Sequence, residues 1–131
     1  MPDNSRLSLA KYRLEKAWEC YNDAVSTLEL GSFNTAANRI YYSIFHAMRA
    51  VLALDGFDSK KHSGIISAFR QRYIKTGVFD MKFSETIELG FRLRVKSDYD
   101  DFYIVLKSEV SEQIDDSKHF LSAVVEFINA Q

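Results

Sequence analysis

The sequence of 131 residues has little of the chemistry that stabilises small secreted domains or anchors a chain in a membrane. It has one cysteine, Cys20, which cannot form a disulfide within the chain, and this usage favours a reducing compartment. None of its apolar runs approaches the roughly 20 residues of a membrane span, and residues 1–16 contain no apolar signal segment. We therefore expect a cytoplasmic protein that does not cross a membrane.

An excess of charge of one sign is also absent, because 17 Lys and Arg residues are balanced by 18 Asp and Glu residues and the net charge is −1. Any binding of nucleic acid must then depend on a local cationic patch. No glycine-rich phosphate loop, paired-cysteine zinc motif, HExxH helix or nucleophile elbow occurs. The three histidines, His46, His62 and His119, fall in different segments, so we expect no metal site and no cofactor.

Apolar and aromatic residues are plentiful, at 47% and 14% of the chain, and this composition excludes a disordered protein. A chain of this length can bury a core without a metal or a disulfide, and we expect residues 1–131 to form one domain. Apolar residues recur at helical spacing, no convincing strand alternation or hairpin dipeptide occurs, and the single proline is Pro2. The predicted fold is all-α.

Turn signals divide the chain into helices. Gly31 suits the left-handed residue that follows a first helix over 5–30, which Ser5 or Ser8 can cap. A second helix over 33–54 follows so closely that the two should be antiparallel neighbours. The remaining predicted elements are a basic loop, a helix from Ser63, a helix capped by Ser84, a turn from Asp98 that packs Tyr99 and Phe102 onto the bundle, and a helix after Ser108.

The predicted helix over 33–54 has three faces. An apolar arc should face the core, and a strip of small residues should let another helix approach closely. The arc consists of Ala37, Ile40, Tyr41, Ile44, Phe45, Met48, Val51 and Leu52, and the strip consists of Ala36, Ser43, Ala47 and Ala50. The opposite side carries a polar row of Thr35, Arg39, Tyr42, His46 and Arg49.

This polar row is the first candidate site. Arg39 can engage a phosphate or carboxylate bidentately, Tyr42 can stack or donate a hydrogen bond, and His46 titrates near neutral pH. Arg49 in the same row and His62 in the basic loop complete the candidate ligand-binding residues. The row could equally be a buried polar network that joins helices, or a solvated face with an aromatic residue at a dimer contact.

The second candidate site is the segment FRLRVKSDYDDF, residues 91–102. Its charged groups are Arg92, Arg94 and Lys96, followed by Asp98, Asp100 and Asp101, with Tyr99 among the acidic residues. Such a cluster could be a surface network of salt bridges, since cations in a last turn complement the helix dipole. It could instead act on a phosphodiester, with Arg94 stabilising negative charge and Asp98 or Tyr99 moving a proton.

Three segments follow one another along the chain: RIYYSIFHAMRAVL, then SKKHSG with IISAFRQRYIKTG, then FRLRVKSDYDDF. They resemble the successive signatures of the HEPN domain family, in particular its compact UPF0332-like branch, and the likeness covers 8–127. The resemblance implies an up-and-down bundle of four to five helices, commonly a homodimer, often encoded beside a minimal nucleotidyltransferase in a toxin–antitoxin or related system. Many members are metal-independent ribonucleases in which an arginine and a histidine, spaced as RX4–6H and paired across the dimer, cleave RNA.

The sequence departs from this motif at its histidine. Arg92 or Arg94 can stand for the motif arginine, but acidic and aromatic residues occupy the positions where the histidine is expected. A carboxylic acid with a pKa of about 4 is a poor proton donor at neutral pH unless burial raises that pKa. His46 or His62 could take the role if the fold brings one of them near the arginine. In the UPF0332-like branch the degenerate motif is usual, which favours binding over cleavage.

Three hypotheses of different classes follow. The preferred one is a HEPN module that dimerises and binds a nucleotide, an RNA or a nucleotidyltransferase partner through Arg39, Tyr42, His46, Arg94 and Tyr99. The second is a metal-independent ribonuclease toxin that uses Arg94 with Asp98, Tyr99 or a histidine from elsewhere in the chain. The third is a helical interaction subunit whose polar row is only structural.

Overall fold

The computed structural model of the protein describes residues 3–99 and 104–131. Within these residues it has five α-helices, a short π-helical segment and no strand, which confirms the all-α prediction. The elements are α1 (Asn4–Glu29), α2 (Phe33–Ala53), α3 (His62–Phe69), η1 (Arg70–Ile74), α4 (Lys82–Tyr99) and α5 (Lys107–Asn129). None of the helices in this part of the chain combines the length and the apolar character that crossing a membrane requires.

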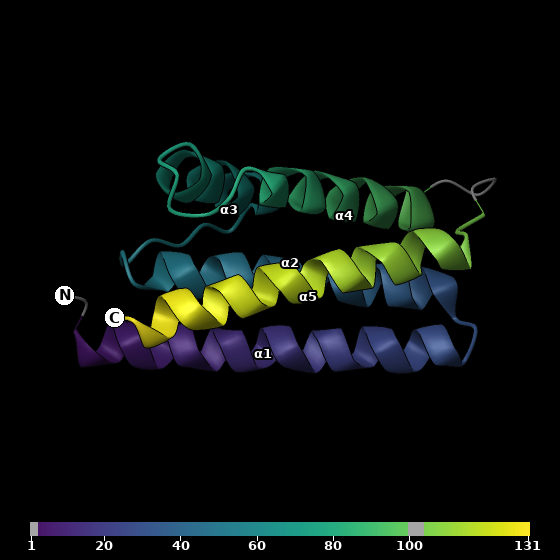
Figure 1. Ribbon diagram of the computed structural model, residues 1–131, viewed down its shortest axis with the longest axis horizontal. Coiled ribbons are helices and arrows are strands. Elements are labelled where there is room, and N and C mark those ends of the chain that lie inside the picture. Colours follow the sequence, from purple (N-terminus) through teal and green to yellow (C-terminus); the bar gives the residue numbers. More distant parts are fainter. Residues whose placement is uncertain (1–2, 100–103) are drawn as a thin grey trace.

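The four long helices lie side by side as an up-and-down bundle (Figure 1). α1 and α2 are antiparallel, as their short connection predicts, and α4 and α5 are antiparallel as well. The short α3 lies at one end of the bundle, near the start of α4. α2 is the central element because it packs against all four other α-helices.

The core forms where the apolar arc of α2 meets the other helices. Every residue of the predicted arc is buried, which confirms that this side faces inward. Aromatic rings from the neighbouring helices extend the same core. Phe120 of α5 lies 5.6 Å from Phe69 of α3 and 5.2 Å from Phe83 of α4, measured between ring centres. The buried arc therefore fixes which side of α2 remains available at the surface.

Small residues hold α1 and α2 close together. Ala47 and Ala50 of the predicted strip are fully buried, and so is Ala17 of α1. The Ser43 hydroxyl, also fully buried, donates a hydrogen bond to the Ala17 carbonyl oxygen at 2.8 Å. A serine side chain reaches the backbone of a neighbouring helix only where the two helices approach closely, so the predicted close-contact strip is confirmed.

A glycine brings α4 close to α2 and α5. A Cβ atom at Gly90 would lie 3.0 Å from Gln113 Nε2 on α5 and 3.1 Å from Ile44 Cδ1 on α2. Both distances are shorter than the roughly 3.5–4.0 Å of a favourable contact, so glycine permits this approach. The buried Gln113 then donates a hydrogen bond to the Thr86 carbonyl oxygen of α4 at 2.7 Å.

Both ends of α1 were assigned from the sequence, with different outcomes. Gly31 has a φ of 81° and follows the helix, as predicted. The predicted cap at Ser5 or Ser8 is wrong, because the helix begins earlier and the Asp3 carboxylate accepts a hydrogen bond from the Arg6 N–H at 2.8 Å. An aspartate at this position caps as well as a serine does, so composition alone did not separate them.

The predicted boundaries of α4 are wrong at both ends. The helix begins at Lys82, whose N–H donates to the Asp80 carboxylate at 2.9 Å, so Ser84 lies inside the helix instead of capping it. At the other end α4 continues through Tyr99, which is 73% exposed and does not pack onto the bundle. Phe102, predicted to pack beside it, lies outside the described residues.

The helix predicted from Ser63 begins one residue earlier, at His62, and changes character part-way. At Arg70 the α-helical turns give way to the π-helical segment η1. The Lys75 N–H donates to the Arg70 carbonyl oxygen, five residues earlier, at 2.9 Å. Such segments recur at functional sites, and this one lies beside the start of α4.

Enlarging a residue of the small strip should force α1 and α2 apart. We expect Ala47→Leu to lower the free energy of unfolding by about 1–3 kcal/mol, because added methylene groups in a closely packed contact shift the backbone. Urea denaturation followed by circular dichroism measures this change. Ser26→Leu also enlarges a small side chain, but on the exposed side of α1, and should change the free energy by less than about 0.5 kcal/mol. Equal losses in the two variants would contradict the close packing.

Candidate functional site

Arg94 lies on α4 with its guanidinium group over two tyrosine rings of α2. The guanidinium carbon is 5.2 Å from the ring centre of Tyr41 and 5.6 Å from that of Tyr42. Its Nη2 donates a hydrogen bond to the Tyr42 hydroxyl at 3.4 Å. The side chain is only 17% exposed. Cation–π contacts and this hydrogen bond therefore hold a positive charge at a defined place between α2 and α4.

Asp98, one turn after Arg94 on α4, balances that charge. Its Oδ2 lies 3.3 Å from Arg94 Nε. This contact is an ion pair without a well-directed hydrogen bond, because the buried Nε has no acceptor in suitable geometry among the described residues. This i, i+4 ion pair stabilises the helix at Asp98, where the sequence predicted that a turn begins.

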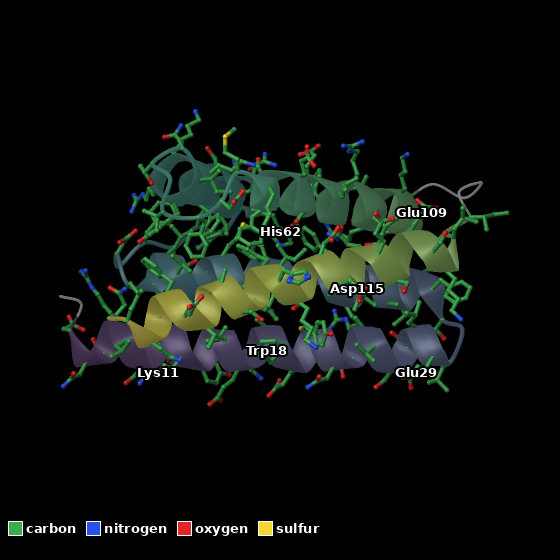
Figure 2. All side chains as sticks on the ribbon, in the orientation of Figure 1. Lys11, Trp18, Glu29, His62, Glu109 and Asp115 are labelled. Atoms are coloured by element: carbon green, nitrogen blue, oxygen red, sulfur yellow. The ribbon has the colours of Figure 1, made fainter. Side chains whose placement is uncertain are left out.

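His62 reaches the same place from the start of α3. Its Nδ1 lies 2.9 Å from the Tyr41 hydroxyl oxygen, and which of the two groups donates depends on the histidine tautomer. The imidazole centre is 4.3 Å from the ring centre of Phe45 and 5.7 Å from that of Tyr42. His62 lies between the layer of α3 and α4 and the helices below it (Figure 2). Tyr41 thus contacts both His62 and Arg94.

The surroundings of Tyr41 and His62 set the protonation states of these two side chains. Burial raises the pKa of Tyr41 to about 12, so its hydroxyl keeps its proton at neutral pH. Partial burial, then the positive charges of Arg94 and Arg49, lower the pKa of His62 below its usual value. His62 is therefore neutral at pH 7 and can accept a proton beside a guanidinium group that can stabilise negative charge.

The polar row of α2 meets this cluster at Tyr42. The guanidinium carbon of Arg39 is 5.4 Å from the ring centre of Tyr42, and the His46 ring is 6.3 Å from it. Arg39 donates two hydrogen bonds to the Asn38 side-chain oxygen, at 2.8 and 3.1 Å. Within residues 3–99 and 104–131 no carboxylate pairs with Arg39. Tyr42 therefore has two guanidinium groups beside its ring.

The far end of the row is bound to the loop after α2. Arg49 forms an ion pair with Asp58 at 2.9 Å, and Arg13 of α1 reaches the same carboxylate at 3.2 Å. The hydrogen bond from Arg49 is the largest cause that lowers the pKa of Asp58. The structure therefore shares the charge of Arg49 with a carboxylate, while Thr35 at the near end of the row is exposed.

The sequence matches the HEPN domain over residues 10–128. The chain belongs to the HEPN domain family. Three relatives give the comparison more detail. A UPF0332 protein of Thermotoga maritima is 30% identical over 125 residues, 95% of each chain. A UPF0332 protein of Archaeoglobus fulgidus is 30% identical over 89% of this chain and 93% of its own. A Methanocaldococcus jannaschii protein named "Putative toxin MJ0142" is 28% identical over 88% of this chain and 78% of its own.

In this HEPN chain only part of the degenerate motif comes together. Arg94 and Asp98 contact each other, whereas Tyr99 is exposed at the end of α4. Arg92 pairs with Glu88 one turn earlier, at 3.6 Å, so Arg94 is the arginine that faces α2. In the described part of the chain, no three His, Cys, Asp or Glu side chains come together as a metal site would require.

Two aromatic residues of the candidate site were not among the predicted site residues. Tyr41 and Phe45 belong to the apolar arc and were assigned to the core, where both are indeed buried. Tyr41 nevertheless carries a hydroxyl group, and a buried hydroxyl needs a hydrogen-bond partner. A tyrosine on the core side of α2 was therefore the available signal that a polar partner, here His62, lies next to it.

His46 should make the stability of this HEPN bundle depend on pH. Burial is the largest cause that lowers its pKa, followed by the charges of Arg49, Arg39, Lys16 and Arg13. Because the folded state resists protonation, the unfolded state takes up the proton first as the pH falls below the ordinary value of about 6.5, and stability is lost.

We expect the wild type to lose stability relative to His46→Gln as the pH falls from about 7.5 to about 5, because only the wild type carries this penalty. Urea denaturation of both proteins across this pH range measures it. His119→Gln, at an exposed position of α5, serves as the control and should follow the wild type. A constant difference between wild type and His46→Gln at every pH would contradict the prediction.

Proposed function

We propose that this chain is a HEPN module that binds the phosphate groups of an RNA or nucleotide at Arg94 and acts with a minimal nucleotidyltransferase partner. The position of Arg94 over Tyr41 and Tyr42 carries the proposal. A guanidinium group offers paired donors that match a phosphate, and tyrosine rings beside it can stack on bases. We infer that the setting is a toxin–antitoxin or defence system and that the chain forms a homodimer.

The donors around Arg94 support phosphate binding. Its buried Nε has no acceptor among the described residues, although Asp98 is close by. Arg39 also contacts the ring of Tyr42. Among the residues described, its guanidinium group is hydrogen-bonded only to the neutral side chain of Asn38. Two guanidinium groups beside one tyrosine repel each other, and a phosphate between them would relieve that repulsion. Arg39 and Arg94 would supply the local cationic patch that nucleic-acid binding by a chain of net charge −1 requires.

The names of the relatives and the family resemblance support the proposal that the chain acts with a partner protein in a toxin–antitoxin or defence system. Two proteins of Methanocaldococcus jannaschii that match this chain are named as putative toxins. The third hypothesis, a purely structural row, has less support. Arg39 is partly exposed and binds the residue next to it in sequence, so its hydrogen bonds do not join two helices. A second polypeptide or an RNA is the better account of a guanidinium group that pairs with no carboxylate among the described residues.

Arg94→Ala should weaken binding of a single-stranded RNA oligonucleotide by about tenfold or more, because a charged hydrogen bond is lost. Fluorescence anisotropy measures the affinity, and circular dichroism checks that helicity is unchanged. Arg92→Ala removes an exposed arginine of the same helix that pairs with Glu88, and should change the affinity less than about twofold. Equal losses in both variants would indicate nonspecific attraction and contradict the proposed site.

Arg94→Ala also tests whether a nucleotidyltransferase binds at the candidate site. A minimal nucleotidyltransferase from the same genome, co-expressed with the tagged wild-type chain, should co-purify with it. Arg94→Ala should reduce the amount recovered, whereas Arg92→Ala should not. A partner recovered equally well with all three proteins would show that it binds elsewhere on the bundle.

A metal-independent ribonuclease is the second candidate function, and the contact of Tyr41 with both His62 and Arg94 favours it. Neutral His62 could take the proton of an RNA 2′-hydroxyl as the 2′-oxygen attacks phosphorus and the bond to the 5′-oxygen breaks. The 5′-oxygen leaves with a proton from solvent, and Arg94 stabilises the charge on the phosphorane. Tyr99 has no place in this scheme, since it is exposed and apart from Arg94.

If the chain is a nuclease, it should cleave single-stranded RNA in the presence of a chelator. Arg94→Ala and His62→Gln should each reduce the rate by about a hundredfold or more, because general base catalysis and charge stabilisation are lost. Gel analysis of end-labelled RNA measures the rate, and His119→Gln is the control for an exposed histidine. RNA that stays intact with the wild type would exclude cleavage and leave the binding function in place.

A further inference from the structure

We propose that the groove between α3 and α4 is a nucleobase-binding subsite. It would hold the base of the nucleotide whose phosphate contacts Arg94, so it rests on the proposed function. The groove has a volume of about 380 Å³. Its apolar wall is formed by Ile66, Ile87 and Phe91, and its polar wall includes Arg70 and Glu88. Mostly apolar pockets with a few polar groups are typical of small-molecule sites.

The groove adjoins the Arg94 site on both of its sides. On α3, Ser63 lines the groove and follows His62 directly in the chain. On α4, Phe91 lines the groove and lies one helical turn before Arg94. The ring centre of Phe91 is 6.1 Å from that of Tyr41, the residue that contacts both His62 and Arg94. A ligand bound through its phosphate at Arg94 can therefore reach the groove with its base.

The apolar wall suits a flat aromatic ligand. Phe91 is 37% exposed, so part of its ring is open to a ligand in the groove. Ile87 forms the floor at 1% exposure, and Ile66 is partly buried on the facing helix. An aromatic side chain at the mouth of an apolar groove offers a stacking surface, and stacking of a base on such a ring is tolerant of base identity.

The polar wall suits the edge of a base. Arg70 donates hydrogen bonds to the Glu88 carboxylate at 3.3 Å and to the Ser84 carbonyl oxygen at 3.2 Å. Among the described residues, two buried side-chain nitrogens have no acceptor, and they are Nε of Arg70 and Nε of Arg94. Buried donors of this kind indicate a missing partner. Arg70 lies on the groove, whereas the Arg94 Nε at the phosphate site has the Asp98 carboxylate 3.3 Å away in unfavourable geometry for a hydrogen bond.

The backbone of the polar wall is itself irregular. Arg70 and Gln71 line the groove, and both belong to η1. A π-helical segment replaces the regular hydrogen bonds of an α-helix and is found frequently at functional sites. η1 adds a second observation, independent of the side chains, that marks this wall for binding.

Nucleoside 5′-monophosphates and ribose 5-phosphate test the subsite, because the second ligand has the phosphate and sugar but no base. We would titrate each of AMP, GMP, CMP and UMP, and ribose 5-phosphate, into the wild-type chain and follow its NMR spectrum. Ribose 5-phosphate should shift the signals of His62 and Arg94 only. At least one nucleotide should shift the methyl signals of Ile66 and Ile87 in addition, and should bind about tenfold more tightly.

Two variants on one helix make the test specific. Phe91→Ala should weaken the affinity for the nucleotide by about tenfold, because the base stacks on the ring. The affinity for ribose 5-phosphate, which has no base, should not change. Leu89→Ala, also exposed on α4 but outside this groove, should change neither ligand. Arg94→Ala should weaken both ligands.

The outcomes separate the subsite from the proposed function. Nucleotides that shift His62 and Arg94 without Ile66 and Ile87, or that bind no better than ribose 5-phosphate, would overturn the subsite and leave phosphate binding intact. Shifts of Ile66 and Ile87 without any at Arg94 would support the groove and count against phosphate binding at Arg94. If none of the five compounds shifts any signal, both proposals fail.

Discussion

α2 packs against all four other α-helices, and this constraint decides where the bundle can present a site. A helix enclosed in this way buries its apolar arc in the core and its small residues against α1, which leaves one narrow side at the surface. That side carries Arg39, Tyr42 and His46. The two helices that border it, α3 and α4, supply His62 and Arg94. The candidate site thus follows from the packing of one helix.

The faces of α2 could be predicted because helical geometry alone fixes which side chains lie together. The irregular parts of the fold could not. A π-helical segment at Arg70–Ile74 keeps the same apolar residues, so no pattern of hydrophobicity reveals it. The end of α4 was misread because acidic residues in a row resemble a turn, whereas the ion pair of Asp98 with Arg94 extends the helix. Both errors arise from tertiary or side-chain interactions that override local composition.

The sequence identified Arg94 and the polar row as candidates, but it did not predict that they contact each other in the fold. His62 is separated from Tyr41 by the end of α2 and a loop, and no local sequence pattern predicts where the residue after such a loop lies in the fold. The sequence carries no signal that Phe91 remains partly exposed beside a groove. The sequence therefore predicted the components of the site, and the packing of α4 on α2, permitted by Gly90, determined their assembly.

The ion pairs of Asp58 have an effect beyond the loop that contains it. Arg13 and Arg49 hold Asp58 against two helices, and His62 follows a few residues later at the start of α3. The two arginine side chains are only 11% and 25% exposed, so dissolved ions screen these pairs less than they screen fully exposed ones. Arg13, Arg49 and Asp58 therefore help to hold the start of α3, and with it His62, although none of the three contacts RNA or nucleotide in the proposed complex.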